Sequence, residues 1–141
     1  MMFLRKAEIF VGVSAEVLDR IQAMAEEEQV PEGHVFFRAG EPAAFLYVLK
    51  DGQVALTTVG AAPITFPIGE AGAVFGWSAL VEPRTYTATC ETTMPTTVIR
   101  LDGTQLLQMF EDNPQDGLLV LRRLAGVMAS RLRASYERFA R

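Results

Sequence analysis

The chain has 141 residues, of which 50% are hydrophobic and 21% are charged. This length fits one domain around one core, and this composition excludes a disordered chain. No apolar run reaches the roughly 18 residues that suggest a membrane span, and the first ten residues do not resemble a secretory signal. We therefore expect one soluble domain, residues 1–141, with no membrane partner.

The formal net charge of -4 is unevenly distributed along the chain. The C-terminal segment is basic, because Glu137 is outnumbered there by Arg122, Arg123, Arg131, Arg133, Arg138 and Arg141. The remaining acidic body argues against a nucleic-acid-binding surface. The basic segment could contact nucleic acid or an acidic partner, but a solvated helix face is the favoured interpretation. We expect no nucleic-acid partner for this chain alone.

Residue types that carry catalysis or bind metals are scarce. Cys90 is the single cysteine, so an internal disulfide is excluded and a reducing cytoplasm is the simplest location. In an alternating segment, Cys90 is interpreted as a small core residue rather than a nucleophile. His34 is the single histidine, which excludes a histidine-based metal cluster. The sequence therefore predicts neither an enzyme nor a metal site.

In chain order, the first predicted element is a helix that Ser14 caps. Its apolar positions Val17, Leu18 and Ile21 follow helical spacing. We expect it to end near Glu28, with residues 26–28 as its solvated end. Short strands separated by turns follow, at 35–38, 45–49, 54–59, 64–66, 74–75, 86–90 and 97–101. Asp51-Gly52 predicts a hairpin turn, and the strand spacing predicts an antiparallel sandwich or barrel.

Two helices are predicted after the strands. Asp102 caps the first, with Gln105 completing a capping box. Asn113 caps the second, which starts at Pro114 and runs to about Phe139. A seam spaced by fours and threes runs along it, formed by Leu121, Ala125, Met128, Leu132, Ser135 and Phe139. A helix about 39 Å long exceeds what a small β-domain covers. We therefore expect a homodimer through this helix, with its arginines pointing outward.

The segment 74–88 carries the strongest chemical pattern. A strand runs into Gly76, and a short helical turn follows. Backbone N–H groups at such a turn can face an anion, and Arg84 could add a bidentate contact to phosphate or carboxylate. Alternatively, Arg84 pairs with Glu82 at the surface. From these residues alone, an anion site is one of two interpretations.

The same segment resembles the phosphate-binding cassette of the cyclic nucleotide-binding domain family, which includes catabolite activator protein-like regulators. The matching positions are Phe75, Gly76, Ala79, Leu80, Pro83, Arg84 and Thr85, and residues 9–14, 38–43 and 46–54 resemble other family motifs. The resemblance implies a mainly β fold with flanking helices. An eight-stranded jelly roll (30–101) would lie between an N-terminal helical segment (1–29) and C-terminal helices (102–141). It also implies that the long helix forms the dimer seam.

One departure from the family pattern bears on the ligand. The glutamate that accepts from the ribose 2'-OH in the family is replaced by Trp77, whose indole can only donate. An unpaired ribose hydroxyl should cost about 1–3 kcal/mol, so weak cAMP binding is expected. Ser78 and Tyr86 also differ from the family's usual residues. The resemblance places Ser135 near the purine, although plain helix packing is the preferred interpretation.

Together these observations predict a ligand-sensing regulatory module that signals through its C-terminal helix. The expected ligand is a cyclic nucleotide such as cAMP, or a related small phosphate-bearing anion. The alternative is a degenerate domain that binds no nucleotide and acts as a dimerising interaction module. The candidate ligand-binding residues are Phe75, Gly76, Trp77, Ser78, Ala79, Leu80, Arg84, Thr85, Tyr86 and Ser135.

Overall fold

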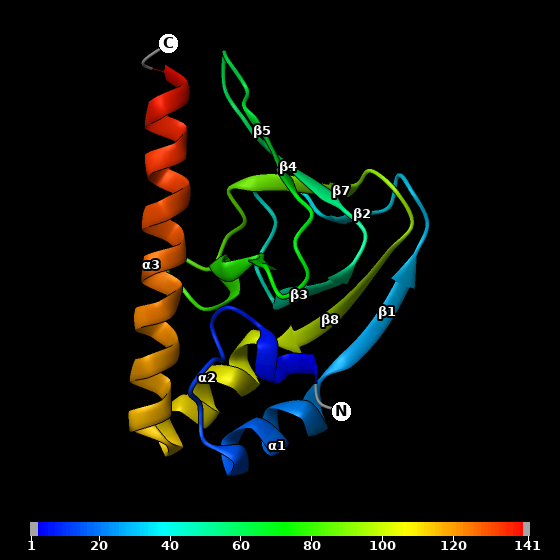
Figure 1. The fold of residues 1–141 in the computed structure, drawn as a ribbon. Helices are drawn as coiled ribbons and strands as arrows, with labels where there is room; N and C mark the ends of the chain where they lie inside the picture. The colour runs from blue at the N-terminus through cyan, green and yellow to red at the C-terminus, as the bar shows by residue number, and fades with distance from the viewer. Residues whose placement is uncertain (1–2, 140–141) are drawn as a thin grey trace.

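Residues 3–139 are described by a computed structural model, in which two four-stranded antiparallel sheets lie beside one long helix (Figure 1). The first sheet has the order β1 (Glu26–Val30), β8 (Thr96–Asp102), β3 (Phe45–Asp51) and β6 (Val74–Phe75). The second has the order β2 (Val35–Phe37), β7 (Ala88–Thr92), β4 (Val54–Thr58) and β5 (Thr65–Ile68). This arrangement is the predicted eight-stranded jelly roll with flanking helices.

The helical elements are η1 (Phe3–Lys6), α1 (Ala15–Met24), η2 (Trp77–Ala79), α2 (Gly103–Asp112) and α3 (Pro114–Phe139). Two predicted N-caps are confirmed, because Ser14 accepts from the Val17 amide and Asp102 accepts from the Gln105 amide. Asn113 occupies the predicted position before α3, and its carbonyl accepts from the Gly117 amide at 2.9 Å, but its side-chain amide donates to the Met109 carbonyl at 3.0 Å. That bond satisfies a carbonyl at the end of α2 instead of capping α3.

The packing of β3 explains why its sequence is almost continuously apolar. Successive side chains of a strand point to opposite faces. Tyr47 and Leu49 therefore face the core between the two sheets, whereas Leu46 and Val48 face the helices. On the helical side, Leu46 and Val48 belong to a core that also contains Phe10, Ile21, Leu106 and Leu124. Both faces of β3 are thus buried over residues 46–49.

The segment after α1 corrects the sequence prediction. Glu26, Glu27 and Glu28 belong to strand β1, not to the end of a helix, and they pair with β8 in the register Glu26 to Arg100. Arg100 forms ion pairs with Glu26 and Glu28, and Lys50 forms one with Glu27 at 2.7 Å. Strand pairing and these basic neighbours outweigh the helix preference of glutamate.

The turn at Gly52 also differs from the prediction. The strands on either side of it, β3 and β4, belong to different sheets and do not pair, so the turn is a corner and not a hairpin. Gly52 has a φ of 108°, and an added Cβ would lie 2.7 Å from the Pro95 carbonyl oxygen. The chain therefore crosses between sheets where it packs against the turn before β8.

Helix α3 runs along the side of the jelly roll, and its C-terminal half lies near the β4–β5 hairpin (Figure 1). Four of its apolar side chains, Leu118, Leu121, Leu132 and Tyr136, are from 38% to 63% exposed. Met128 departs from the predicted seam, because it packs against the helical core. The side chain of Phe139 lies outside the part that the structure describes. Within that part, no helix is long and apolar enough to cross a membrane.

Candidate functional site

The centre of the site is the turn at Gly76, between β6 and η2. Gly76 is left-handed, with φ 76°, and an added Cβ would lie 3.1 Å from the Phe45 carbonyl oxygen. Only glycine adopts this conformation without strain. The helical turn η2 follows Gly76 and ends at Ala79, which is fully buried. Gly103 of α2 packs directly against Ala79. An added Cβ on Gly103 would lie 2.5 Å from the Ala79 carbonyl oxygen.

A cavity of about 380 Å³ lies between this turn, the second sheet and α3. Its walls are mostly apolar, with hydroxyl groups from β4, from η2, from the segment before β7 and from α3. The lining residues are Phe37, Leu56, Thr58, Phe66, Gly76, Trp77, Ser78, Tyr86, Thr87, Ala88, Met128, Ala129, Arg131, Leu132 and Ser135. The structure therefore brings together five of the predicted site residues: Gly76, Trp77, Ser78, Tyr86 and Ser135.

The other five predicted residues are not among those that line this cavity. Phe75 and Ala79 are fully buried in the core between the sheets, and Leu80 is buried against the helices. Thr85 forms an isolated antiparallel bridge with Pro42. The motif positions Phe75, Ala79 and Leu80 thus shape the turn by packing, and their binding role stays a prediction.

Arg84 is held by α2 and by the backbone around it. Its Nη2 donates to Thr104 Oγ1 at 3.1 Å, so it contacts a hydroxyl of α2. Its φ is 58°, a left-handed conformation that is uncommon outside glycine. The Ala43 amide donates to its carbonyl at 2.8 Å. That Arg84 binds an anion stays a prediction: its Nη2 is bonded to α2, and its buried Nε has no hydrogen-bond partner in the described part of the chain.

Tyr86 forms a rigid part of the cavity wall. Its hydroxyl donates to the Phe45 carbonyl at 2.6 Å, and its ring stacks on Phe37 with a centroid distance of 3.8 Å. Burial raises the pKa of Tyr86 above its ordinary value. The ring therefore stays a neutral, fixed surface against which a flat ligand could lie.

Sequence reasoning missed Arg131, which was expected to point outward. Its side chain is only 25% exposed, its guanidinium carbon lies 4.7 Å from the Trp77 ring centroid, and its Nη2 lies 3.7 Å from Glu8 Oε2. Burial lowers the pKa of Arg131, and the charge of Glu8 opposes that shift. One signal was present in the sequence: Arg131 precedes Ser135 by four residues, so both lie on one face of the helix.

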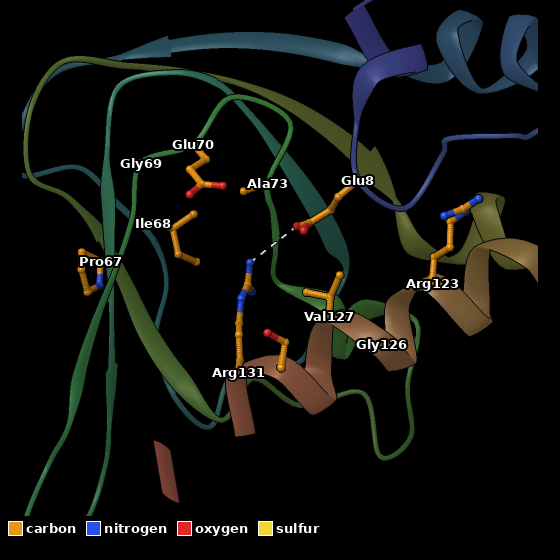
Figure 2. A pocket seen from close by; sticks show the side chains of 11 residues that line it. Glu8, Pro67, Ile68, Gly69, Glu70, Ala73, Arg123, Gly126, Val127 and Arg131 are labelled. Carbon is orange, nitrogen blue, oxygen red and sulfur yellow. Dashed lines mark ion pairs between the residues drawn. The ribbon is translucent and has the colours of Figure 1, made fainter. Parts of the chain in front are cut away.

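A second cavity, of about 600 Å³, shares Arg131 with the first. It lies between α3, the N-terminal segment and the loop after β5, and it carries charges of both signs from Glu8, Glu70, Arg123 and Arg131. Figure 2 shows Arg131 reaching from α3 across this cavity towards Glu8. Arg131 thus belongs to the walls of both cavities.

Two observations concern metal-binding and nucleophilic groups among residues 3–139. Within this range, no group of three or more His, Cys, Asp or Glu residues could hold a metal ion. Cys90 is fully buried, and burial raises the pKa of its thiol, so it lacks the thiolate character of a nucleophile. The site has the features of a binding pocket.

Comparison with known proteins agrees with this geometry. The family model described as cyclic nucleotide-binding domain matches residues 27–113. A Geobacter metallireducens GS-15 protein described as cyclic nucleotide-binding is 30% identical, with a TM-score of 0.81, and the match covers 92% of this chain and 95% of that one. No curated protein matched the chain.

Two further solved structures support the fold alone. A cyclic nucleotide-binding domain from Methylobacillus flagellatus KT is 24% identical, with a TM-score of 0.80 over 96% of this chain and 78% of that one. The Thermus thermophilus catabolite activator protein is 23% identical, with a TM-score of 0.75 over 95% of this chain and 62% of that one. Since the family model covers more than half of the chain, from β1 through α2, this chain belongs to the cyclic nucleotide-binding domain family.

Proposed function

We propose that the chain is a ligand-sensing regulatory module that binds a cyclic nucleotide, or a related small phosphate-bearing anion, in the cavity beside Gly76. The observation that carries this proposal is the cavity of about 380 Å³, which the cassette turn and α3 line together. A ligand there contacts the sheet domain and the long helix at once. Its binding can therefore change the position of α3, which is the element that faces any partner.

A thermal-shift screen tests ligand binding directly. Any compound that binds only the folded state raises the melting temperature, so cAMP, cGMP and other phosphorylated metabolites are compared at equal concentration. A concentration-dependent rise with one of them supports the proposal. A melting temperature that no phosphorylated compound changes would overturn it.

The expected preference among nucleotides follows from Trp77. Since an indole cannot accept from the ribose 2'-OH, cAMP should bind weakly, and Trp77→Glu should bind it about ten- to a hundredfold more tightly. Calorimetry on both proteins checks this expectation. Submicromolar binding of cAMP by the unmutated chain would contradict it.

We propose that the output of this module is carried by a homodimer formed along α3. The exposed apolar side chains of Leu118, Leu121, Leu132 and Tyr136 support this part, and Ala125 and Ala129 leave room for close approach of a second helix. A reducing cytoplasmic location, consistent with the buried free thiol of Cys90, completes the proposal.

The second candidate function is a dimerising interaction module that binds no nucleotide. Two observations favour it: Trp77 stands where the family has its ribose acceptor, and Arg84 is engaged by Thr104. A negative ligand screen together with a dimer in solution would select this candidate. A positive screen would exclude it.

A further inference from the structure

We infer that the cavity of about 600 Å³ between α3, the N-terminal segment and the loop after β5 is a second ligand site. Its ligand class is a small, extended zwitterion, with an ammonium group at one end and a carboxylate at the other. The site is separate from the cavity beside Gly76, and the inference does not depend on nucleotide binding there. Figure 2 shows the three segments of the chain that surround this second cavity.

The charges on the walls of this cavity favour a dipolar ligand. The charged lining residues are two carboxylates and two guanidinium groups, whose formal charges cancel: Glu8, Glu70, Arg123 and Arg131. A simple anion would be repelled by the carboxylates, and a simple cation would be repelled by the guanidinium groups. A molecule with no net charge but with two charged ends can contact both kinds of group at once.

Two of these four charges are paired with each other, and two are free to contact a ligand. Glu8 Oε2 lies 3.7 Å from Arg131 Nη2. The side chains of Glu70 and Arg123 are exposed, and they form neither a hydrogen bond nor an ion pair within the described part of the chain. They line the same cavity without pairing, so they can receive the opposite ends of one ligand.

The positions of the two free charges set the length of the ligand. In Figure 2, Glu70 and Arg123 lie on opposite sides of the Glu8–Arg131 pair. Arg123 precedes Arg131 by two helical turns, which is about 12 Å along the axis of α3. An extended chain of about six bonds between the ammonium nitrogen and the carboxylate carbon spans about 7 Å. A hydrogen bond of about 2.9 Å at each end brings its reach to about 13 Å.

The middle of the site is fixed before any ligand enters. The Val74 amide donates to Glu8 Oε2 at 2.7 Å, and the Glu8 amide donates to the Gly72 carbonyl at 3.0 Å. Gly72 is itself in close contact with the N-terminal segment, because an added Cβ would lie 3.0 Å from the Lys6 carbonyl oxygen. Glu8 is therefore held against the loop after β5 and directed towards Arg131 (Figure 2). Walls that are already ordered lower the cost of binding.

Gly126 provides open space on the helix side of the cavity. It lies in the interior of α3, where glycine is less favourable than alanine. A Cβ added to Gly126 would meet no atom within 4 Å, so close packing does not require glycine there. Gly117 of the same helix differs, because its added Cβ would lie 2.6 Å from the Phe110 Cβ. The missing side chain of Gly126 instead leaves room in the cavity that this residue lines.

Residue-resolved NMR on the full chain tests the site with a matched set of probes. The main probe is 6-aminohexanoate, which has the chain length derived above. Hexanoate and hexylamine each keep the chain and one charge, and glycine keeps both charges without the chain. The amide shifts of Gly69 and Gly126 report on this site, whereas those of Gly76 and Ser78 report on the other cavity.

Saturable shifts at Gly69 and Gly126 are expected with 6-aminohexanoate at concentrations at least about threefold lower than with hexanoate, hexylamine or glycine. Each singly charged analogue loses one of the two ion pairs, and glycine is too short to form both. The ratio is modest because solvent screens the two exposed side chains.

Variants assign the two ends of the ligand. Glu70→Gln should remove the advantage of 6-aminohexanoate over hexanoate, and Arg123→Gln should remove its advantage over hexylamine. The controls Glu111→Gln and Arg122→Gln remove the same charges at exposed positions outside the cavity, so they should leave binding unchanged. Gly126→Leu places a side chain in the open space, so it should lose binding without lowering the melting temperature.

Circular dichroism shows whether each variant folds, and if one does not, the comparison of the four probes on the unmutated chain decides the matter. No saturable shift with 6-aminohexanoate, or equal binding of all four probes, would overturn the inference. Shifts confined to Gly76 and Ser78, or unchanged binding in both Glu70→Gln and Arg123→Gln, would do the same. The proposed function is judged by the separate screen with phosphorylated compounds, so its failure can be told apart from the failure of this site.

Discussion

Gly76 combines a left-handed backbone with close neighbours, and the two effects can be separated by mutation. Gly76→Ala should lose about 1–2 kcal/mol of stability from the backbone alone, and about 1 kcal/mol or more in addition because the Cβ would crowd Phe45, Tyr47 and Phe37. Gly33→Ala is the matched control, since Gly33 has a φ of 82° and open space around it. Urea unfolding measures both, and equal losses would show that the crowding is relieved by small shifts.

Alkaline pH should destabilise the fold through buried acids. Burial raises the pKa of Cys90 above its ordinary 9.0 and those of Tyr47 and Tyr86 above 10.0. The unfolded chain therefore releases these protons at a lower pH than the folded chain. The free energy of unfolding should fall as pH rises above 9.0 and fall more steeply above 10.0.

Melting curves between neutral pH and pH 11 check this expectation. Cys90→Ala is the matched variant: it should start from a lower melting temperature, because it leaves a small void, but decline less between pH 9 and pH 10. Identical slopes for the two proteins would rule out the thiol as a contributor.

At the residue scale, the site was only partly predictable. Gly76, Trp77 and Tyr86 stand in a contiguous motif, so local sequence identified them. Arg131 is 54 positions away from Trp77 along the chain, and its contact with that indole depends on how α3 docks. Arg84 was assigned by its motif position, yet its side chain bonds to Thr104, whose proximity only the packed fold reveals.

Among the elements, the cap of α1 is hydrogen-bonded to α3. Ser14 Oγ donates to Asp116 Oδ2 at 2.7 Å, and the Ser14 amide donates to Asp116 Oδ1 at 3.2 Å. Ser14→Ala should cost about 1 kcal/mol, because it also removes the cap of α1. A double-mutant cycle with Asp116→Ala should give a coupling energy of about 0.5–1 kcal/mol. Additive losses in urea unfolding would show that the two helices are held by apolar packing alone.

Most strands were predictable because their apolar runs and turn residues are local signals. The exceptions depend on partners that local sequence does not contain. Glu26–Val30 becomes a strand because β8 and Arg100 lie beside it. The Asp51–Gly52 turn leads into a different sheet because Gly52 packs against Pro95 and Thr96, more than forty residues later.

For the whole molecule, the proposed homodimer can be tested at a residue outside both cavities. Leu121 is 38% exposed and lines neither of them, so Leu121→Glu should split the dimer by placing two carboxylates in an apolar seam. Met94→Glu is the control, since Met94 is an apolar side chain that is 45% exposed in the turn between β7 and β8. Light scattering should report about twice 15.5 kDa for the unmutated chain and the control. A mass of 15.5 kDa for the unmutated chain would contradict the proposal.

The contacts of Gly103 with Ala79 and of Gly117 with Phe110 have a mechanical consequence. The Gly103–Ala79 contact leaves no free space between the cassette turn and α2. The Gly117–Phe110 contact leaves none between α2 and the N-terminal end of α3. A displacement of the turn is therefore delivered to the base of a rod about 39 Å long. Tilting that rod by about ten degrees would move its far end by about 7 Å. Under the proposed function, α3 would therefore act as a lever, because a small shift of the turn would become a larger movement at the far end of the helix.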